Sequence, residues 1–161
     1  MHEQLRVGSR LTISAPRNNF ALREGATHSV LIAGGIGVTP VLCMARRLKA
    51  LGRSFEFLYF ARSRKSAAFV AEIEALGVPV TWHFDDEKGG PPDLRAMLAR
   101  RQPDAGEHYY ACGPTIMLDA FEKECADLGH ANAHIERFAA VEVTASADAR
   151  QAYTVELRRS G

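Results

Sequence analysis

The sequence has few cysteines, and their placement excludes several kinds of site. Cys43, Cys112 and Cys125 lie far apart among 161 residues and form no C-x-x-C pair. They cannot supply the four thiolates of an iron–sulfur cluster. They also fit no disulfide framework, which favours a reducing cytoplasm. His130 and His134 have the spacing of a helix face, but an apparent turn precedes them, so we expect no metal site there.

The chain also lacks a strong charge bias and long apolar runs. Its 20 basic and 19 acidic residues give a formal charge of +1, which offers no argument for nucleic acid or an anionic membrane as a partner. No run reaches the ~18 apolar residues of a membrane span, and the first ten residues do not resemble a secretory signal. With 47% apolar and 24% charged residues, the composition is typical of a folded, soluble protein, which we expect in the cytoplasm because of its cysteine usage.

Short apolar runs alternate with helical patterns along most of the chain. Because helical crossovers join successive buried strands in parallel sheets, this order predicts an α/β fold with a doubly wound, five-stranded parallel sheet. Ligands in such folds bind at the carboxyl ends of the strands. The expected strands are 28–35, 54–61, 78–84, 107–112 and 133–138, and the expected helices are 38–51, 66–76, 92–100 and 115–128.

Two further segments alternate polar and apolar residues, as strands of an antiparallel sheet do. They are 9–15 and 153–157, and neither has an obvious hairpin partner in the chain. Each could pair with an edge of the main sheet, or each could be part of a neighbouring domain, which we favour. Residues 139–152, which are small and polar, are expected to form a linker.

The most informative motif is the glycine-rich stretch that follows the first parallel strand. Gly34, Gly35 and Gly37 allow a tight turn and a close approach of a ligand's phosphates to the backbone. Thr39 can cap the next helix and Pro40 suits its start. The pattern differs from G-x-G-x-x-G because Pro40 replaces the third glycine, and a tight turn without a ligand is the alternative interpretation.

A second candidate motif ends the fourth strand. Gly113 leaves room for a flat ring against the backbone, Pro114 suits a helix start, and Cys112 would place a thiol at the mouth of the cleft. The alternative is that Cys112 is a small buried apolar residue. Phe138, at the end of the fifth strand, could stack on a cofactor or belong to the core.

Charged residues follow the second and third strands. Arg62, Ser63 and Arg64 occupy the position that meets the adenosine ribose in nucleotide-binding α/β folds, and they include no carboxylate. Arginine or serine there can hold a 2′-phosphate, whereas an acidic residue would hydrogen-bond a 2′-hydroxyl. The acidic run 85–87 could suggest a cation site, but the glycines and proline after it favour a mobile loop.

Taken in chain order, six segments resemble the ferredoxin–NADP reductase superfamily, and most closely its phthalate dioxygenase reductase and vanillate demethylase reductase branch. The resemblance implies a flavin barrel, a nucleotide domain and a [2Fe–2S] domain in one longer protein. It divides this chain into the end of the barrel (1–24), the NAD(P)-binding domain (25–138), a linker (139–152) and the first strand of the cluster domain (153–161). The segments are P-R-N-N-F-A-L, L-I-A-G-G-I-G-V-T-P, Y-F-A-R-S, Y-A-C-G-P, I-E-R-F and Y-T-V-E-L-R-R-S-G.

The resemblance also implies roles for particular residues. The phosphate turn would comprise Gly34, Gly35, Gly37, Val38, Thr39 and Pro40. Arg62 and Ser63 would meet the adenosine ribose, with Arg64 beside them. Cys112, Gly113 and Pro114 would border the nicotinamide. Phe138 would shield the flavin ring and Glu136 would lie near the nicotinamide.

The implied activity is hydride transfer from NAD(P)H to FMN or FAD, followed by electron transfer through a [2Fe–2S] centre to an oxygenase or ferredoxin-type partner. The chain lacks the flavin barrel's R-x-Y-S-type motif and the cluster cysteines, so flavin and cluster are expected only in a full-length parent, and the chain alone is expected to be inactive. Two alternatives are a nucleotide-sensing or docking module and an S-adenosylmethionine-dependent methyltransferase, which would require an acidic residue after the second strand.

Overall fold

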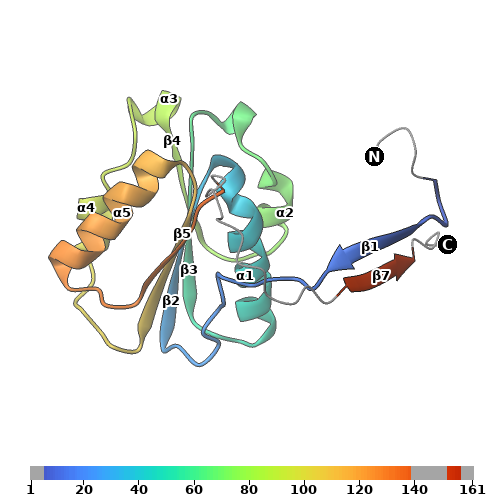
Figure 1. The fold of residues 1–161 in the computed structure, drawn as a ribbon. Helices are drawn as coiled ribbons and strands as arrows, with labels where there is room; N and C mark the ends of the chain where they lie inside the picture. The colour runs from blue at the N-terminus through green and yellow to red at the C-terminus, as the bar shows by residue number, and fades with distance from the viewer. Residues whose placement is uncertain (1–5, 139–151, 157–161) are drawn as a thin grey trace. The chain divides into compact units, whose positions relative to one another are not determined.

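The computed structural model describes residues 6–138 and 152–156, and these residues belong to two compact units. The larger unit, Phe20–Ala139, contains a five-stranded sheet with helices on both faces (Figure 1). Its elements are β2 (His28–Gly34), η1 (Gly35–Gly37), α1 (Val38–Ala50), β3 (Phe55–Ala61), η2 (Arg64–Ser66), α2 (Val70–Glu74), β4 (Val80–Phe84), α3 (Asp85–Lys88), α4 (Leu94–Leu98), β5 (Glu107–Cys112), α5 (Thr115–Leu128) and β6 (Ala133–Glu136).

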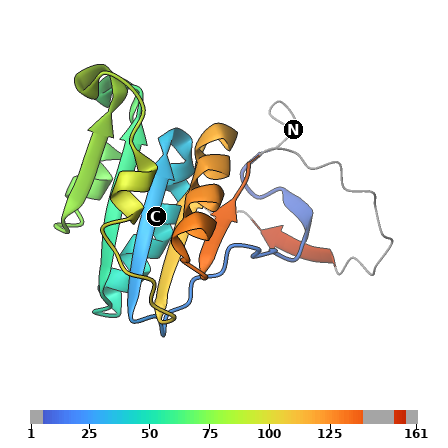
Figure 2. The same ribbon diagram turned by 90° about the vertical axis from the view of Figure 1, so that its left-hand side faces the viewer.

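All neighbouring strands of this sheet are parallel, in the order β4-β3-β2-β5-β6. Figure 2 shows them side by side, with β4 at one edge and β6 at the other. The order reverses at β2, the central strand, so the chain winds outward from it in both directions. A crevice at the carboxyl end of such a switch point is where ligands bind in this class of sheet.

Alternating side chains of the strands build a core on each face of the sheet. On one face, Leu31 and Tyr59 pack against α1; on the other, Ile32 and Phe60 pack against α4 and α5. Both faces of β2 are buried, which explains why its sequence is continuously apolar instead of alternating. The predicted α/β fold with a doubly wound parallel sheet is confirmed.

The unit begins before the expected boundary at residue 25. Phe20 is buried and meets the ring of Tyr110 edge-on, with centroids 5.7 Å apart. The backbone amide of Arg23 donates to the Tyr110 hydroxyl at 2.8 Å. These contacts attach the segment before β2 to the face of β5.

Two predicted segments differ from the structure. The single helix expected over 66–76 is divided, because Phe69 adopts a left-handed conformation with φ 59° between η2 and α2. The run 85–87, expected to be a mobile loop, forms the helical turn α3 directly after β4. The backbone amide of Asp86 donates to the Arg62 carbonyl at 3.1 Å, which joins this turn to the end of β3.

The smaller unit contains β1 (Arg10–Ser14) and β7 (Ala152–Glu156), which pair antiparallel. The register places Arg10 opposite Glu156 and Ser14 opposite Ala152. The expectation that neither segment has a partner in the chain was therefore wrong, as was pairing with the main sheet. Each strand satisfies one edge of the other's backbone hydrogen-bonding groups. The predicted linker lies outside the described residues, except for Ala152, which begins β7.

Candidate functional site

A pocket of about 570 Å³ opens at the carboxyl ends of β2, β3, β4 and β5. Its wall is mainly apolar and contains two charged side chains, Arg62 and Asp85. The lining residues are Gly34, Gly35, Phe60, Ala61, Arg62, Ser66, Asp85, Pro91, Pro92, Leu94, Pro114, Ile116, Met117 and Ala120. The pocket thus lies where the winding of the sheet predicts a ligand site.

The three glycines of the turn after β2 have different surroundings. Gly35 has φ +54° and no atom within 4 Å of the position of a Cβ, so it combines a left-handed conformation with open space. A Cβ on Gly37 would lie 2.2 Å from the Cys112 carbonyl oxygen. Gly37 is buried, so its missing side chain makes room for the neighbouring strand end. The space beside the α-carbon is therefore open at Gly35 and filled by the Cys112 carbonyl at Gly37, and phosphate binding by this turn stays a prediction.

Gly34 and Gly113 bring the ends of β2 and β5 together. A Cβ on Gly113 would lie 3.0 Å from the Gly34 Cα, and a Cβ on Gly34 would lie 2.7 Å from the Met117 sulfur. Larger residues at either position would therefore displace Met117, which is part of the pocket wall. Both glycines allow the strand ends and α5 to pack closely beside the pocket.

The start of α1 departs from the prediction in one respect. The helix begins at Val38, which is fully buried, and no side chain caps it. The Thr39 hydroxyl donates to the Ile36 carbonyl at 3.2 Å instead of accepting a backbone amide, so the predicted cap was wrong. Val38, Thr39 and Pro40 do not line the pocket.

Arg62 lines the pocket, but the two residues after it do not. The Ser63 hydroxyl accepts from the Ser66 amide at 3.1 Å, and the Ser66 hydroxyl hydrogen-bonds the Ser63 side chain and backbone. This capping box fixes the loop and leaves Ser66, which sequence analysis did not select, in the wall of the pocket. The Ser-x-x-Ser spacing was the available signal.

Arg64 turns toward aromatic side chains instead of the pocket. Its guanidinium carbon lies 4.6 Å from the centroid of the Phe84 ring and 5.8 Å from that of Trp82. A carboxylate oxygen of Glu74 and one of Glu87 each lie 3.9 Å from a guanidinium nitrogen of Arg64. A cation over an aromatic face is stabilised by the ring quadrupole. The cofactor-binding role predicted for Arg64 is therefore not supported by its position.

Asp85 is a wall residue that sequence analysis placed in a mobile loop. Register pairing sets Ala61 opposite Phe84, so Arg62 and Asp85 leave neighbouring parallel strands at the same level. The acidic run after the third predicted strand was the signal, but only the order of the strands shows that this run adjoins the loop after β3.

Cys112 is fully buried in the core on the α1 face and does not reach the mouth of the cleft. Burial, with a smaller contribution from the charge of Glu136, raises the pKa of the Cys112 thiol to about 11. The side chain is therefore a neutral packing group near neutral pH. The predicted placement at the mouth was wrong; the alternative of a small buried apolar residue holds.

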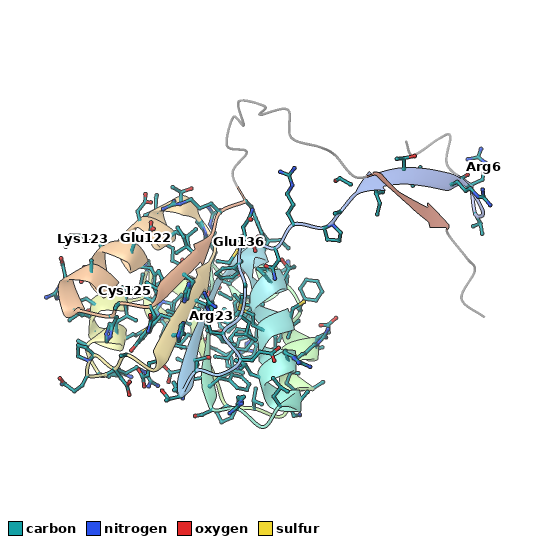
Figure 3. The ribbon with its side chains drawn as sticks, turned by 60° about the horizontal axis from the view of Figure 1, so that its bottom comes forward. Arg6, Arg23, Glu122, Lys123, Cys125 and Glu136 are labelled. Carbon is teal, nitrogen blue, oxygen red and sulfur yellow. The ribbon has the colours of Figure 1, made fainter. Side chains whose placement is uncertain are left out.

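Glu136 and Phe138 lie at the end of β6. Glu136 stands opposite Cys112 in the sheet register and is half-buried, and Figure 3 shows it at the carboxyl end of its strand. Phe138 is 54% exposed, so it does not belong to the core. Neither residue lines the pocket, so their predicted catalytic roles depend on groups outside it.

The Tyr59 hydroxyl contacts both the glycine turn after β2 and the loop between η2 and α2. Its side chain is fully buried, and its hydroxyl lies 3.3 Å from the Gly35 carbonyl and 3.1 Å from the Ala68 carbonyl. The Ala68 amide donates to the same oxygen at 2.9 Å. One hydroxyl therefore positions the glycine turn relative to the loop that carries Ser66.

Within the described part of the chain, no three His, Cys, Asp or Glu side chains gather as a metal site would require. Among the same residues, no helix combines the length and the apolar character needed to cross a membrane. His130 and His134 do not form a helix-face pair: His134 belongs to β6 and His130 lies in the turn before it.

The chain is similar to reductase components of oxygenase systems, although no protein-family model matches it. It is 44% identical over 161 residues to phenoxybenzoate dioxygenase subunit beta of Ectopseudomonas oleovorans, covering all of this chain and 49% of that protein. It is 40% identical over 165 residues to vanillate O-demethylase oxidoreductase of Pseudomonas putida, covering all of this chain and 51% of the relative. The chain thus spans about half the length of the curated relatives it matches.

A solved structure agrees with these relatives. Phthalate dioxygenase reductase, described as a modular structure for electron transfer from pyridine nucleotides to [2Fe–2S], superposes with a TM-score of 0.68 and 30% identity, covering 90% of this chain and 49% of that one. The parallel sheet, the pocket at its switch point and these likenesses agree with one another. The chain is therefore similar over most of its length to vanillate O-demethylase oxidoreductase and to phthalate dioxygenase reductase, of each of which it spans about half.

Proposed function

We propose that the chain is the NAD(P)H-binding part of a reductase that passes hydride from the nucleotide to a flavin, and electrons through a [2Fe–2S] centre to an oxygenase. The observation that carries the proposal is the pocket of about 570 Å³ at the strand ends, because it joins an open glycine, an arginine and an apolar wall. The open glycine and the arginine suit the phosphates of a ligand, and the apolar wall suits a flat ring of the same ligand.

Each part of the wall has a binding role in this proposal. Gly35 lets a phosphate approach the backbone, and Arg62 supplies positive charge beside it. The first turn of α5 has no side-chain cap, so its amide donors are available to the same phosphates. Pro114 and Met117 provide an apolar surface for the nicotinamide. The protein then orients the nucleotide and excludes water from one side of it.

The cysteines of this chain do not fit a [2Fe–2S] cluster. Cys112 and Cys125 are buried in cores on opposite faces of the sheet, and Cys43 is exposed. In the proposal, the flavin and the cluster are held by the portion of the reductase that this chain does not span. Bound there, the flavin would supply two-electron chemistry, retaining the hydride's proton or releasing it to solvent, and the cluster would supply one-electron transfer. The partner in this proposal is an oxygenase component, which agrees with the name phenoxybenzoate dioxygenase subunit beta of one relative.

Calorimetric titration tests the proposal. The chain is titrated with NADH, ADP-ribose and S-adenosylmethionine, and we expect binding of the first two only. Arg62→Ala is expected to weaken NADH binding about tenfold, ~1.4 kcal/mol. Arg46→Ala, which removes an equal charge from the exposed surface of α1, should leave the affinity unchanged. Binding of S-adenosylmethionine without NADH would favour the methyltransferase alternative and refute the proposal.

A further inference from the structure

The first segment of the larger unit, residues 20–26, is held on the sheet through Tyr110 of β5. The Tyr110 ring meets Phe20 edge-on, and its hydroxyl accepts a hydrogen bond from the Arg23 amide at 2.8 Å. The boundary between the two compact units falls directly before Phe20. The contacts at Tyr110 therefore determine where the free connection between the units ends.

Two further contacts accompany this attachment. The Thr27 amide donates to the Gly106 carbonyl at 2.9 Å, so the chain is tied down again immediately before β2. Nε of Arg47 on α1 lies 2.7 Å from a Glu24 carboxylate oxygen, but both side chains are about half exposed, and such ion pairs contribute little to stability. Loss of the contacts at Tyr110 would therefore leave residues 20–26 only weakly attached.

Two histidines complete the cluster around Tyr110. His134 of β6 stacks on the Tyr110 ring with centroids 4.7 Å apart, and His108 of β5 stacks on His134 at 5.2 Å. Nδ1 of His108 lies 2.9 Å from Nε2 of His134. One of these nitrogens must donate and the other accept, so the hydrogen bond requires at least one of the two rings to be neutral.

The surroundings of this pair oppose its protonation. Burial is the main cause that lowers the pKa of each histidine, and the charge of Arg23 opposes protonation of both. Ser29, opposite His108 in the register of β2 and β5, is uncharged, and Glu136 lies two residues beyond His134 on the same face of β6. The cations of α1, which packs on this face of the sheet, are the exposed side chains Arg46, Arg47 and Lys49. Since Arg23 belongs to the attached segment, detaching that segment removes its opposition.

We propose that the His108–His134 pair is an acid-sensitive latch for residues 20–26. While the pair is neutral, the segment stays on Tyr110. Protonation of one ring places an imidazolium beside Arg23, and protonation of both sets two N–H donors against each other, so the segment leaves while the sheet stays folded. The length of free chain that joins the two units then depends on pH. This inference does not depend on nucleotide binding.

Amide hydrogen exchange followed by NMR tests the latch. The measured rate of each amide is compared with the rate of an unstructured chain at the same pH, which gives a protection factor. Above pH 6.5 the attached and released forms are both neutral; below it the released form takes up protons first, and each extra proton shifts the equilibrium about tenfold per pH unit. We expect the protection of the Arg23 amide to fall about tenfold or more between pH 7 and pH 5.5.

Urea separates release of the segment from unfolding of the whole unit. Release exposes little surface, so a low urea concentration should leave the protection of the Arg23 amide nearly unchanged and lower that of Leu31 in β2. Equal protection and equal urea dependence of the two amides would show that the segment leaves only when the sheet unfolds, and would overturn the latch. A protection of the Arg23 amide that is constant between pH 7 and pH 5.5 would also overturn it.

Variants assign the effect to the pair. In His108→Gln/His134→Gln, which removes both titrating rings, the protection of the Arg23 amide should change less than about twofold over the same pH range; His134→Gln is a second variant, with an intermediate change. His28→Gln is the matched control, because His28 is a half-buried histidine on the opposite face of β2 whose pKa burial also lowers. It should keep the wild-type fall. The wild-type fall in both variants of the pair would contradict the proposal.

Discussion

Gly37 lies so close to Cys112 that a Cβ on the glycine would be 2.2 Å from the cysteine's carbonyl oxygen and 2.6 Å from the amide nitrogen of Gly113. Both neighbours are backbone atoms at the end of β5, so they cannot rotate away as a side chain could. The absence of a side chain at Gly37 therefore sets how closely the turn after β2 packs on the next strand.

Gly37→Ala is expected to destabilise the fold by about 1–3 kcal/mol, because the added methyl group overpacks the junction between β2 and β5. Chemical denaturation of both proteins measures the difference. Gly25→Ala is the control, since a Cβ there meets no atom within 4 Å. Equal stability of Gly37→Ala and wild type would show that the junction relaxes freely.

Tyr59→Phe is expected to cost about 1 kcal/mol of stability, because it leaves the Ala68 amide without its hydroxyl partner. It should also weaken NADH binding severalfold, since Gly35 and the loop of Ser66 are no longer held to one point. Chemical denaturation measures the change in stability, and calorimetric titration measures the change in NADH affinity.

Tyr110→Phe is the matched control for that experiment. It removes another buried hydroxyl, which accepts from the Arg23 amide and lies outside the pocket wall. We expect a similar loss of stability with unchanged NADH affinity. Equal effects of both variants on NADH binding would contradict a positioning role for Tyr59.

Thiol labelling tests the environment of Cys112. Burial raises the pKa of its thiol to about 11 and that of Cys125 to about 12, whereas Cys43 is exposed. Because the thiolate is the reactive form, we expect iodoacetamide at pH 8 to modify Cys43 alone in the folded protein and all three cysteines in denaturant. Modification of Cys112 as fast as Cys43 would place its thiol at the surface, as the sequence analysis expected.

His108 and His134 form a pair that is expected to make the stability of the fold depend on pH. Nδ1 of His108 lies 2.9 Å from Nε2 of His134, and their rings are almost parallel. Burial is the main cause that lowers the pKa of each below 6.5, with Arg23 also opposing protonation. Below about pH 6.5 the unfolded chain therefore binds more protons than the folded one, and acidification favours unfolding.

The free energy of unfolding is accordingly expected to be greatest above pH 6.5 and to fall as the pH is lowered toward 5.5. The double variant His108→Gln/His134→Gln should show a shallower fall, with the remainder including His28, whose pKa burial also lowers. Denaturation curves across this range provide the comparison. A variant with the same slope as the wild type would assign the pH dependence to other groups.

The sequence was sufficient to predict the sheet, because its strands are short, mostly apolar runs separated by helical patterns, and β2 ends at a glycine and β5 directly before one. Strand β5 and helix α5 have the predicted bounds. The division of the helix after η2 was missed, because it depends on the left-handed conformation of Phe69, for which residue type gives no local signal.

The candidate site was predictable in position but only partly in composition. Gly35 and Arg62 follow their strands directly, so strand ends locate them. Asp85 lines the same pocket only because β4 pairs with β3. Arg64 lies outside the pocket wall, with its guanidinium over the Phe84 ring. Both placements depend on tertiary contacts that local sequence patterns do not contain. The pairing of β1 with β7 was likewise invisible to local patterns, since more than a hundred residues separate the two strands.

The most direct test of the central claim is a ¹H–¹⁵N NMR titration of the chain with NADH. We predict that the largest shifts of backbone amides fall on Gly34, Gly35, Arg62, Ser66 and Ile116, around the pocket at the carboxyl ends of the strands. A second pocket of about 280 Å³, lined by Glu56, Thr81 and Arg101 among others, provides an internal comparison. Shifts centred on that second pocket, or no shifts at millimolar NADH, would contradict the account.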